Sequence, residues 1–365
     1  MTWDPRRNKT WVRIAGVVLA LLAIAYLVRV VPIRDQCVDS GTGARGVPEE
    51  RPGACLLHGS AADVLVPAPG GCRSLKCEPG IASVLKTARP PLLAVSFLLY
   101  LFGVMLTVER WKILLKLARV TVSLRAAIRL TFDSYAIGFL LPGGMGADAL
   151  RVAFVLGKHK DASVVQVTAS VVVDRLVGFG TMCTIASALA FSGHGGELGS
   201  VRYVFLVGPP LAVVGAMALR YTPILRWMNR GILRRVVGPL DEYARAPGGI
   251  GVLVRASLLG FVASGAQLLA VAMIVWVLGT PPVDAAWVWI GVVFGFIATT
   301  LPGLPGGWGT SDATYVYFFG KAGVPPSTAL AVSLLVRFFG YALSAAGAVS
   351  VLAARRAKPE ERERV

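Results

Sequence analysis

A short Pro-Gly motif occurs twice in this chain, and its residue types suit the binding of an anion. It is Leu-Pro-Gly-Gly-Met-Gly at residues 141–146 and Leu-Pro-Gly-Gly-Trp-Gly at residues 304–309. Glycine turns that open helices leave backbone N–H groups at the positive end of the helix dipole, where phosphate and carboxylate groups bind. The glycines expected to bind substrate in this way are Gly143, Gly144, Gly146, Gly306, Gly307 and Gly309.

Charged side chains follow both copies of the motif in the same order. First comes an aspartate, Asp148 or Asp312, and then an arginine, Arg175 or Arg337, inside the next long apolar segment. The offset between the copies is nearly constant, so we interpret the chain as one ancestral unit used twice. A charge at the centre of a membrane helix costs roughly 2.5–3.5 kcal/mol on insertion scales, and such residues usually face a polar interior.

These charges predict a phosphate site, because a guanidinium donates two parallel hydrogen bonds to a phosphate. The expected phosphate ligands are Arg151, Arg175 and Arg337. We expect their partners in the absence of substrate, or the carriers of a coupling proton, to be Asp148, Asp174 and Asp312. Two simpler interpretations stay open. The aspartates after the motifs would only cap their helices, and the arginines would only form internal ion pairs.

The composition is that of an integral membrane protein. Hydrophobic residues make up 55% of the chain and the mean hydropathy is +0.66. About six apolar stretches reach the ~18 residues that span a bilayer. They lie near residues 12–31, 91–109, 163–191, 201–219, 252–278 and 328–353. The first could be a cleaved signal peptide, but its long apolar run without a small-x-small cleavage site favours an uncleaved helix.

The two regions that contain the motif, residues 126–157 and 285–320, are predicted to be re-entrant hairpins. Proline and glycine break each helix, and the two arms of the first region are too short for two crossings. Three crossings separate the motifs, so the first hairpin would enter from the cytoplasm and the second from outside. We therefore expect an all-α polytopic protein with an inverted-topology repeat, which is typical of secondary transporters with a mid-membrane substrate site. Inversion should bring Arg175 and Arg337 to one cavity, although ordinary kinked helices remain an alternative.

The net charge of +17 does not indicate nucleic-acid binding. Basic residues cluster in short loops beside helix ends, and this positive-inside pattern predicts that both termini are cytoplasmic. The basic segment at residues 221–250 is either an amphipathic helix on the lipid surface or a plain connector. The predicted organisation is an N-terminal helix at 1–32, an outer loop at 33–90, repeat one at 91–220, the linker at 221–250, repeat two at 251–353 and a cytoplasmic tail at 354–365.

Four of the five cysteines lie in the outer loop. They are Cys37, Cys55, Cys72 and Cys77. An even number in an oxidising compartment predicts two disulfides, with three pairings open and a zinc site as the rival interpretation. Together with the charge pattern, this predicts a bacterial inner-membrane protein whose cysteine-containing loop is periplasmic or extracellular.

Residues 141–151, 171–175 and 304–337 resemble the lysylphosphatidylglycerol synthase transmembrane region, or flippase-like, family, over roughly residues 90–353. The family's first motif typically ends in Glu-x-x-Arg, where this chain has Asp148 one position later. Asp312 stands for the glutamate of the second motif, and Asp174 with Arg175 for a Glu-Arg pair. In the namesake, the membrane domain is similar to a flippase joined to an aminoacyltransferase domain, which we do not expect here.

The leading hypothesis is a lipid flippase that moves an anionic phospholipid or a polyprenyl-phosphate-linked sugar through a mid-membrane phosphate site. One alternative is a non-catalytic accessory subunit of lipid or glycolipid synthesis, with a synthesis enzyme as partner. Another is a membrane-embedded lipid-modifying transferase. The sequence has no Walker motif, no His-Glu-x-x-His and no apparent Ser-His-Asp set, so we expect no catalytic residue, metal or cofactor. Transport would then be passive or ion-coupled, and the oligomeric state is open.

Overall fold

The computed structural model describes residues 21–39, 45–51, 54–58, 63–67, 75–138, 146–189, 245–279, 283–300 and 307–356, with a few single residues besides. Among these, four helices are long and apolar enough to cross a membrane, which confirms the predicted all-α polytopic class. They are α3 (Pro90–Leu115), α6 (Val164–Leu189), α10 (Gly249–Val277) and α13 (Pro326–Arg356). The first predicted span is described as a helix over Leu21–Val30. The span at 201–219 and most of the linker at 221–250 lie outside the described residues.

Each region that contains a Pro-Gly motif forms two short helices instead of one long helix. The helices have 12 to 16 residues, and at about 1.5 Å per residue they are shorter than a hydrocarbon core of about 30 Å. The break in the second hairpin includes Gly307 and Gly309, whose positive φ angles of 69° and 80° favour glycine. The first hairpin is α4 (Leu124–Gly138) with α5 (Gly146–Lys158), and the second is α11 (Ala285–Thr300) with α12 (Thr310–Lys321).

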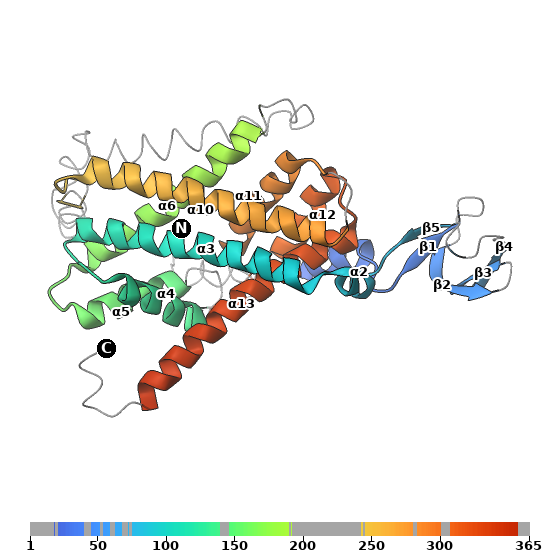
Figure 1. Ribbon diagram of the computed structural model, residues 1–365, viewed down its shortest axis with the longest axis horizontal. Coiled ribbons are helices and arrows are strands. Elements are labelled where there is room, and N and C mark those ends of the chain that lie inside the picture. The colour runs from blue at the N-terminus through green and yellow to red at the C-terminus, as the bar shows by residue number, and fades with distance from the viewer. Residues whose placement is uncertain are drawn as a thin grey trace, which may run out of the picture.

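The helices pair as two related halves, α3–α6 and α10–α13. The leading helices α3 and α10 pack along each other, α4 packs on α13, and α11 packs on α6, so each hairpin contacts the long helix of the other half. The hairpins lie toward opposite ends of the long helices (Figure 1). This exchange of equivalent contacts between the halves fits the inverted repeat that the sequence predicts. Entry of the hairpins from opposite membrane faces stays a prediction.

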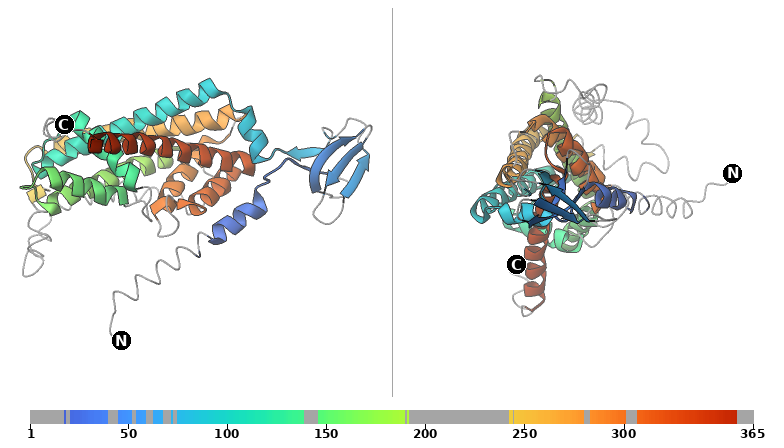
Figure 2. Two further views of the ribbon diagram at one scale, coloured as in Figure 1. Left: turned by 90° about the horizontal axis from the view of Figure 1, so that it is seen from below. Right: turned by 90° about the vertical axis from the view of Figure 1, so that its right-hand side faces the viewer.

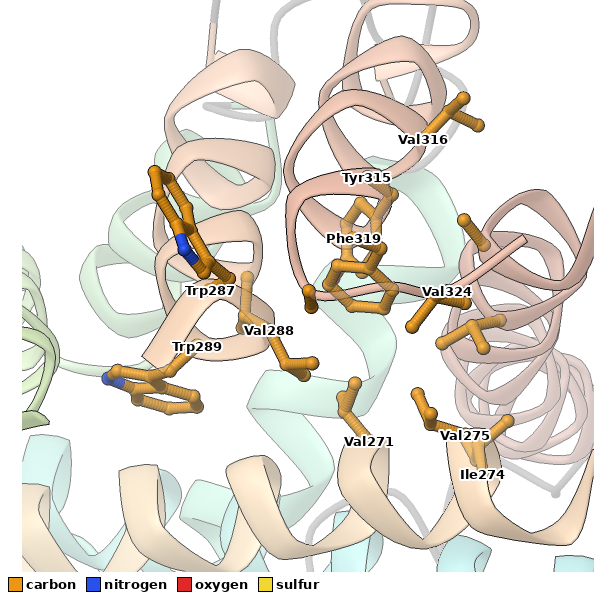
Figure 3. Packing of buried hydrophobic residues seen from close by; sticks show 14 of the residues in the cluster. Val271, Ile274, Val275, Trp287, Val288, Trp289, Tyr315, Val316, Phe319 and Val324 are labelled. Carbon is orange, nitrogen blue, oxygen red and sulfur yellow. The ribbon is translucent and has the colours of Figure 1, made fainter. Parts of the chain in front are cut away.

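The second hairpin is packed through aromatic rings against small residues. Figure 3 shows rings and valines of α10, α11 and α12 meeting in one cluster. A side chain at Gly291 would come within 2.8 Å of the Phe319 ring, so this glycine lets α11 and α12 approach closely. Trp289 is fully buried, and its Nε1–H donates to the Met182 carbonyl at 3.1 Å, which ties α11 to α6. In lipid, such close packing is a main source of helix association.

The predicted outer loop contains an antiparallel five-stranded sheet that the sequence analysis did not foresee. The strand order is β4-β3-β2-β1-β5, and the sheet extends beyond the end of the bundle that holds α12 (Figure 2). The two predicted disulfides are present and join Cys37 to Cys77 and Cys55 to Cys72. The strands are β1 (Gln36–Val38), β2 (Arg45–Arg51), β3 (Ala54–His58), β4 (Asp63–Pro67) and β5 (Lys76–Glu78).

A short helix, α2 (Ile81–Thr87), connects this sheet to the membrane bundle. The Asp35 carboxylate accepts hydrogen bonds from the Gly80 backbone N–H at 2.7 Å and from the Ser83 hydroxyl at 3.0 Å. These bonds hold the start of α2 against the segment that enters the sheet. Val84 of α2 is buried in the same cluster as the second hairpin, and α2 packs on α13.

Candidate functional site

An ion pair joins the first hairpin to the long helix that follows it. Arg175 of α6 donates from Nε and Nη2 to the two carboxylate oxygens of Asp148, both at 2.8 Å. Asp148 lies in the first turn of α5, where a negative charge is also favoured by the helix dipole. About 40% of the Arg175 side chain is exposed, so this two-pronged contact is open on one side.

The corresponding pair in the second hairpin is buried and has more partners. Arg337 of α13 donates from Nη2 to Asp312 at 2.6 Å and to the Ser311 hydroxyl at 2.9 Å. The Asp312 carboxylate also accepts the Ser333 hydroxyl at 2.6 Å and the Gly309 backbone N–H at 2.9 Å. Asp312 therefore caps its helix and pairs with the arginine at once, and the two interpretations of this residue are compatible.

One nitrogen of the Arg337 guanidinium takes no part in that network. Its Nη1 is buried and makes no hydrogen bond with the described residues. The guanidinium carbon lies 4.2 Å from the centre of the Trp308 ring, within the range of a cation–π contact. Trp308 in turn donates its Nε1–H to the Tyr341 hydroxyl at 2.8 Å. The tryptophan of the second motif thus covers the arginine.

Asp174 pairs with an arginine that the sequence analysis did not select. Arg110 of α3 donates from Nε to Asp174 at 2.7 Å, and both side chains are 6% exposed. Successive residues on a helix point about 100° apart, so Asp174 faces α3 while Arg175 faces the hairpin. Apolar residues continue beyond Arg110 to Leu115 and were the available signal, but the predicted span ends at residue 109, where the charges begin.

Two glycines make room for the Arg110 guanidinium. A side chain at Gly178 would come within 2.9 Å of its Nη2, and one at Gly260 within 3.3 Å of its Nη1. The glycines belong to α6 and α10, so the guanidinium lies where three helices meet. Small residues of this kind are the usual way for membrane helices to admit a polar group between them.

Arg151 of α5 is buried and lies close to two aromatic rings. Its guanidinium carbon is 5.4 Å from the Trp111 ring centre and 5.2 Å from that of Tyr135. It donates to the Tyr135 hydroxyl at 3.2 Å and lies 3.6 Å from Asp148. Arg151 therefore adds positive charge beside the Asp148–Arg175 pair.

These side chains line two cavities that adjoin. The first cavity, of about 190 Å³, is lined by the charged residues Arg110, Arg151, Asp174 and Arg175. The second cavity, of about 250 Å³, is lined on its polar side by Ser311, Tyr315, Ser333 and Arg337. Both are bounded by Tyr100, Met182, Gln267 and Phe296, which we call the shared wall. Arg175 and Arg337 thus line two different cavities that share this wall, whereas the sequence analysis expected one cavity for both.

The glycines predicted to bind substrate are described in part. Gly146 is the first residue of α5. Gly307 and Gly309 lie directly before α12, the second helix of the second hairpin. The Gly309 N–H is used by Asp312 and is not free for an anion. Gly143, Gly144 and Gly306 lie outside the described residues. Within the described ranges, no group of three His, Cys, Asp or Glu side chains is placed to hold a metal ion.

One of the comparisons with known proteins identifies a family for this chain. Residues 80–347 match the family described as the lysylphosphatidylglycerol synthase TM region, a span that includes both hairpins and excludes the sheet. Neither the curated proteins nor the solved structures include a match to the chain. Since the matched span covers well over half of the sequence, the chain is a multi-pass membrane protein that belongs to the lysylphosphatidylglycerol synthase transmembrane region family.

Proposed function

We propose that this protein moves an anionic lipid between the leaflets of a membrane and holds the lipid phosphate between its two hairpins. The observation that carries the proposal is the pair of adjoining cavities, each with an arginine from a different half of the molecule. Polar and ionisable residues inside a membrane protein commonly mark a substrate pathway. The family's name refers to the synthase of a lipid, which supports this class of substrate.

In this mechanism the lipid phosphate competes with a carboxylate for an arginine. Arg175 is held by Asp148 through two hydrogen bonds of 2.8 Å, a geometry that a phosphate can reproduce. When Arg175 turns to the phosphate, α5 loses its link to α6 and the first hairpin can move. Asp148 recaptures Arg175 when the lipid leaves, which resets the site for the next lipid.

The proposed orientation follows from charge and redox chemistry. The disulfide-bonded sheet lies outside the cytoplasm, because disulfides persist in oxidising compartments. Both termini lie in the cytoplasm, in keeping with the basic loops at the other helix ends. A bacterial inner membrane fits both requirements.

The test is lipid flipping by purified protein in liposomes. Phosphatidylglycerol with a fluorescent acyl chain would be added to both leaflets, and quenching by dithionite from outside would report the flipped fraction. We expect Arg175→Ala and Arg337→Ala to lower the rate at least about tenfold, since a charge-assisted hydrogen bond contributes about 1.5–3 kcal/mol. Arg175→Lys keeps the charge but cannot donate two parallel hydrogen bonds. Its flipping rate should lie between those of wild type and Arg175→Ala.

A matched control is Arg129→Ala, because this arginine lies on α4 of the first hairpin and lines neither cavity. Size-exclusion profiles and thermal unfolding would show which variants are folded. Rates that stay unchanged in folded Arg175→Ala and Arg337→Ala would overturn the phosphate mechanism. Absence of flipping with phosphatidylglycerol and with a polyprenyl-phosphate sugar would overturn the transport proposal and favour an accessory role.

A further inference from the structure

The two cavities are lined by equivalent positions of the two repeats that differ in residue type. The sequence Asp-Ala-Leu-Arg at residues 148–151 corresponds to Asp-Ala-Thr-Tyr at residues 312–315, so Tyr315 occupies the place of Arg151. The residue before the helix arginine is Asp174 in the first repeat and Val336 in the second. Tyr315 and Val336 line the second cavity, as their counterparts line the first. The two cavities are therefore lined by equivalent positions but differ in charge.

The first cavity has one positive charge in excess and the second is close to neutral. Three arginines and one aspartate line the first cavity, and the Asp148 carboxylate lies against two of these arginines, so one positive charge is not balanced. In the second, Arg337 is the charged lining residue, and it is held by a carboxylate that is itself bound by Ser333 and by a backbone N–H. A ligand anion would have to displace Asp312 from all these partners, which is harder than displacing the half-exposed pair in the first cavity.

Unused hydrogen-bonding groups are present in the second cavity and the shared wall. Among the described residues, none forms a hydrogen bond with the Tyr315 hydroxyl, the Tyr100 hydroxyl or the Gln267 amide. An apolar ligand would leave these groups unpaired, at a cost of about 1–3 kcal/mol each if they are buried. Together they offer both donors and acceptors without net charge. The rings of Tyr100, Phe296 and Tyr315 provide apolar faces next to these groups.

We infer that the second cavity takes a neutral, hydroxyl-bearing part of the lipid headgroup while the first takes its phosphate. The substrate class is then a lipid-anchored phosphate ester of a polyol, such as a hexose or inositol. A polyol has hydroxyls for the amide and phenol groups and C–H faces for the rings. An ammonium headgroup fits less well, because it would lie beside Arg337 and find no free carboxylate. This inference rests on the proposed function and narrows its substrate.

The test compares initial flipping rates of four fluorescent lipids in the same liposomes. Phosphatidylinositol and a mannosyl-phosphoryl polyprenol both carry a polyol phosphate, on different anchors. Phosphatidic acid carries the phosphate alone, and phosphatidylethanolamine carries an ammonium. We expect at least one polyol phosphate to be flipped about tenfold faster than phosphatidic acid and phosphatidylethanolamine, because sites that hydrogen-bond a substrate hydroxyl discriminate strongly against its absence. The faster of the two polyol phosphates identifies the anchor.

Variants separate the two parts of the headgroup. Tyr315→Phe and Tyr100→Phe remove one hydroxyl each, and Gln267→Leu removes the amide at similar volume. Each should lower the rate for the polyol phosphate about five- to tenfold more than that for phosphatidic acid, whereas Arg175→Ala should lower both rates equally. The tyrosine variants keep the ring, so they remain informative if Gln267→Leu does not fold.

The outcomes distinguish this inference from the proposed function. If phosphatidic acid and phosphatidylethanolamine are flipped as fast as the polyol phosphates, the protein is a transporter and the polyol site is wrong. Equal losses for all four lipids in Tyr315→Phe would also overturn the polyol site. If neither phosphatidylglycerol nor any of the four lipids is flipped by folded protein, the proposed function itself fails.

Discussion

In the first repeat the Asp148–Arg175 pair leaves 40% of the arginine side chain exposed, whereas in the second repeat the Asp312–Arg337 pair is 3% and 6% exposed. The two pairs occupy equivalent positions and use the same residue types. The first has one carboxylate and one guanidinium in a two-pronged contact, and the second is part of a network with a helix cap and two serines. The first pair is therefore more accessible and has fewer partners than the second, which fits the proposed exchange of the first pair with a lipid phosphate.

The first repeat also contains a buried pair that the second lacks. Arg110 and Asp174 neutralise each other between α3 and α6, while the position equivalent to Asp174 is Val336 in the second repeat. Burying two charges is expensive, and a well-packed apolar pair is often as stable. This pair lies at the edge of the first cavity, so its removal can test whether it contributes to the proposed substrate binding or to stability.

The strongest way to test this difference is to break the buried pair on one side only. Arg110→Ala leaves the Asp174 carboxylate buried without its partner, and we expect it to lower the free energy of unfolding by about 3–5 kcal/mol. Unfolding in mixed micelles with increasing dodecyl sulfate, followed by tryptophan fluorescence, would measure this change.

The double variant Arg110→Met/Asp174→Val gives the first repeat the apolar character of the second and serves as the control. We expect it to recover most of the lost stability while it lowers the flipping rate, because the pair is removed without an unpaired charge. A double variant as unstable as Arg110→Ala would show that the ion pair itself stabilises the bundle.

The second prediction compares the two aspartates of the hairpins directly. Asp312→Ala removes a helix cap and leaves Arg337 and Ser333 without their acceptor, so we expect a loss of about 3 kcal/mol in the free energy of unfolding. Asp148→Ala should cost only about 1 kcal/mol, because Arg175 is partly exposed and can be solvated. The same micelle titration measures both, and equal losses would contradict the proposed division of roles between the repeats.

The smallest expected effect on stability comes from the contacts of His58 with two carboxylates in the exposed sheet. His58 of β3 contacts Glu49 at 2.7 Å through Nε2 and Asp63 at 3.1 Å through Nδ1. The hydrogen bond with Glu49, and then that with Asp63, raises the pKa of His58 above its usual 6.5. The hydrogen bond with His58, with the nearby Arg51 charge, lowers the pKa of Glu49 below 4.5.

The signs of these shifts define a pH window for the sheet. The contribution of His58 is fully present below pH 6.5 and is lost as the pH rises through its raised folded pKa, and that of Glu49 is lost as the pH falls below 4.5. NMR titration of histidine-labelled protein, with His58→Gln to assign the signal, should give a pKa above 6.5. A value at or below 6.5 would contradict the contacts. Because these side chains are exposed to solvent, the effect of the contacts on stability is small.

Much of the membrane fold could be predicted from the sequence, because apolar length and helix-breaking residues are local signals. The four long helices and the break of each hairpin follow from such signals. The sheet was missed because its strands have only 3 to 7 residues and carry charges, proline and glycine, and the cysteines alone drew attention to it.

The candidate site could be predicted only in part. Asp148, Arg175, Asp312 and Arg337 were selected because a charge in an apolar helix is conspicuous. Arg110 was missed because charges near a helix end resemble a membrane boundary, and its partner is distant in sequence. Tyr100 and Gln267 of the shared wall have no pattern that distinguishes them from packing residues, so only the arrangement of α3 and α10 identifies them.

The Cys37–Cys77 disulfide has a consequence for how this molecule can be altered. It joins β1 to β5, the strands through which the chain enters and leaves the sheet, and the two cysteines are direct partners across the ladder. Everything between them is a closed loop attached to the bundle at one point. An insertion, an epitope tag or a different small domain between these cysteines leaves the spacing of the flanking helices unchanged. The sheet is in this sense an interchangeable module, and its attachment point is a natural place to add a label or a handle to the protein.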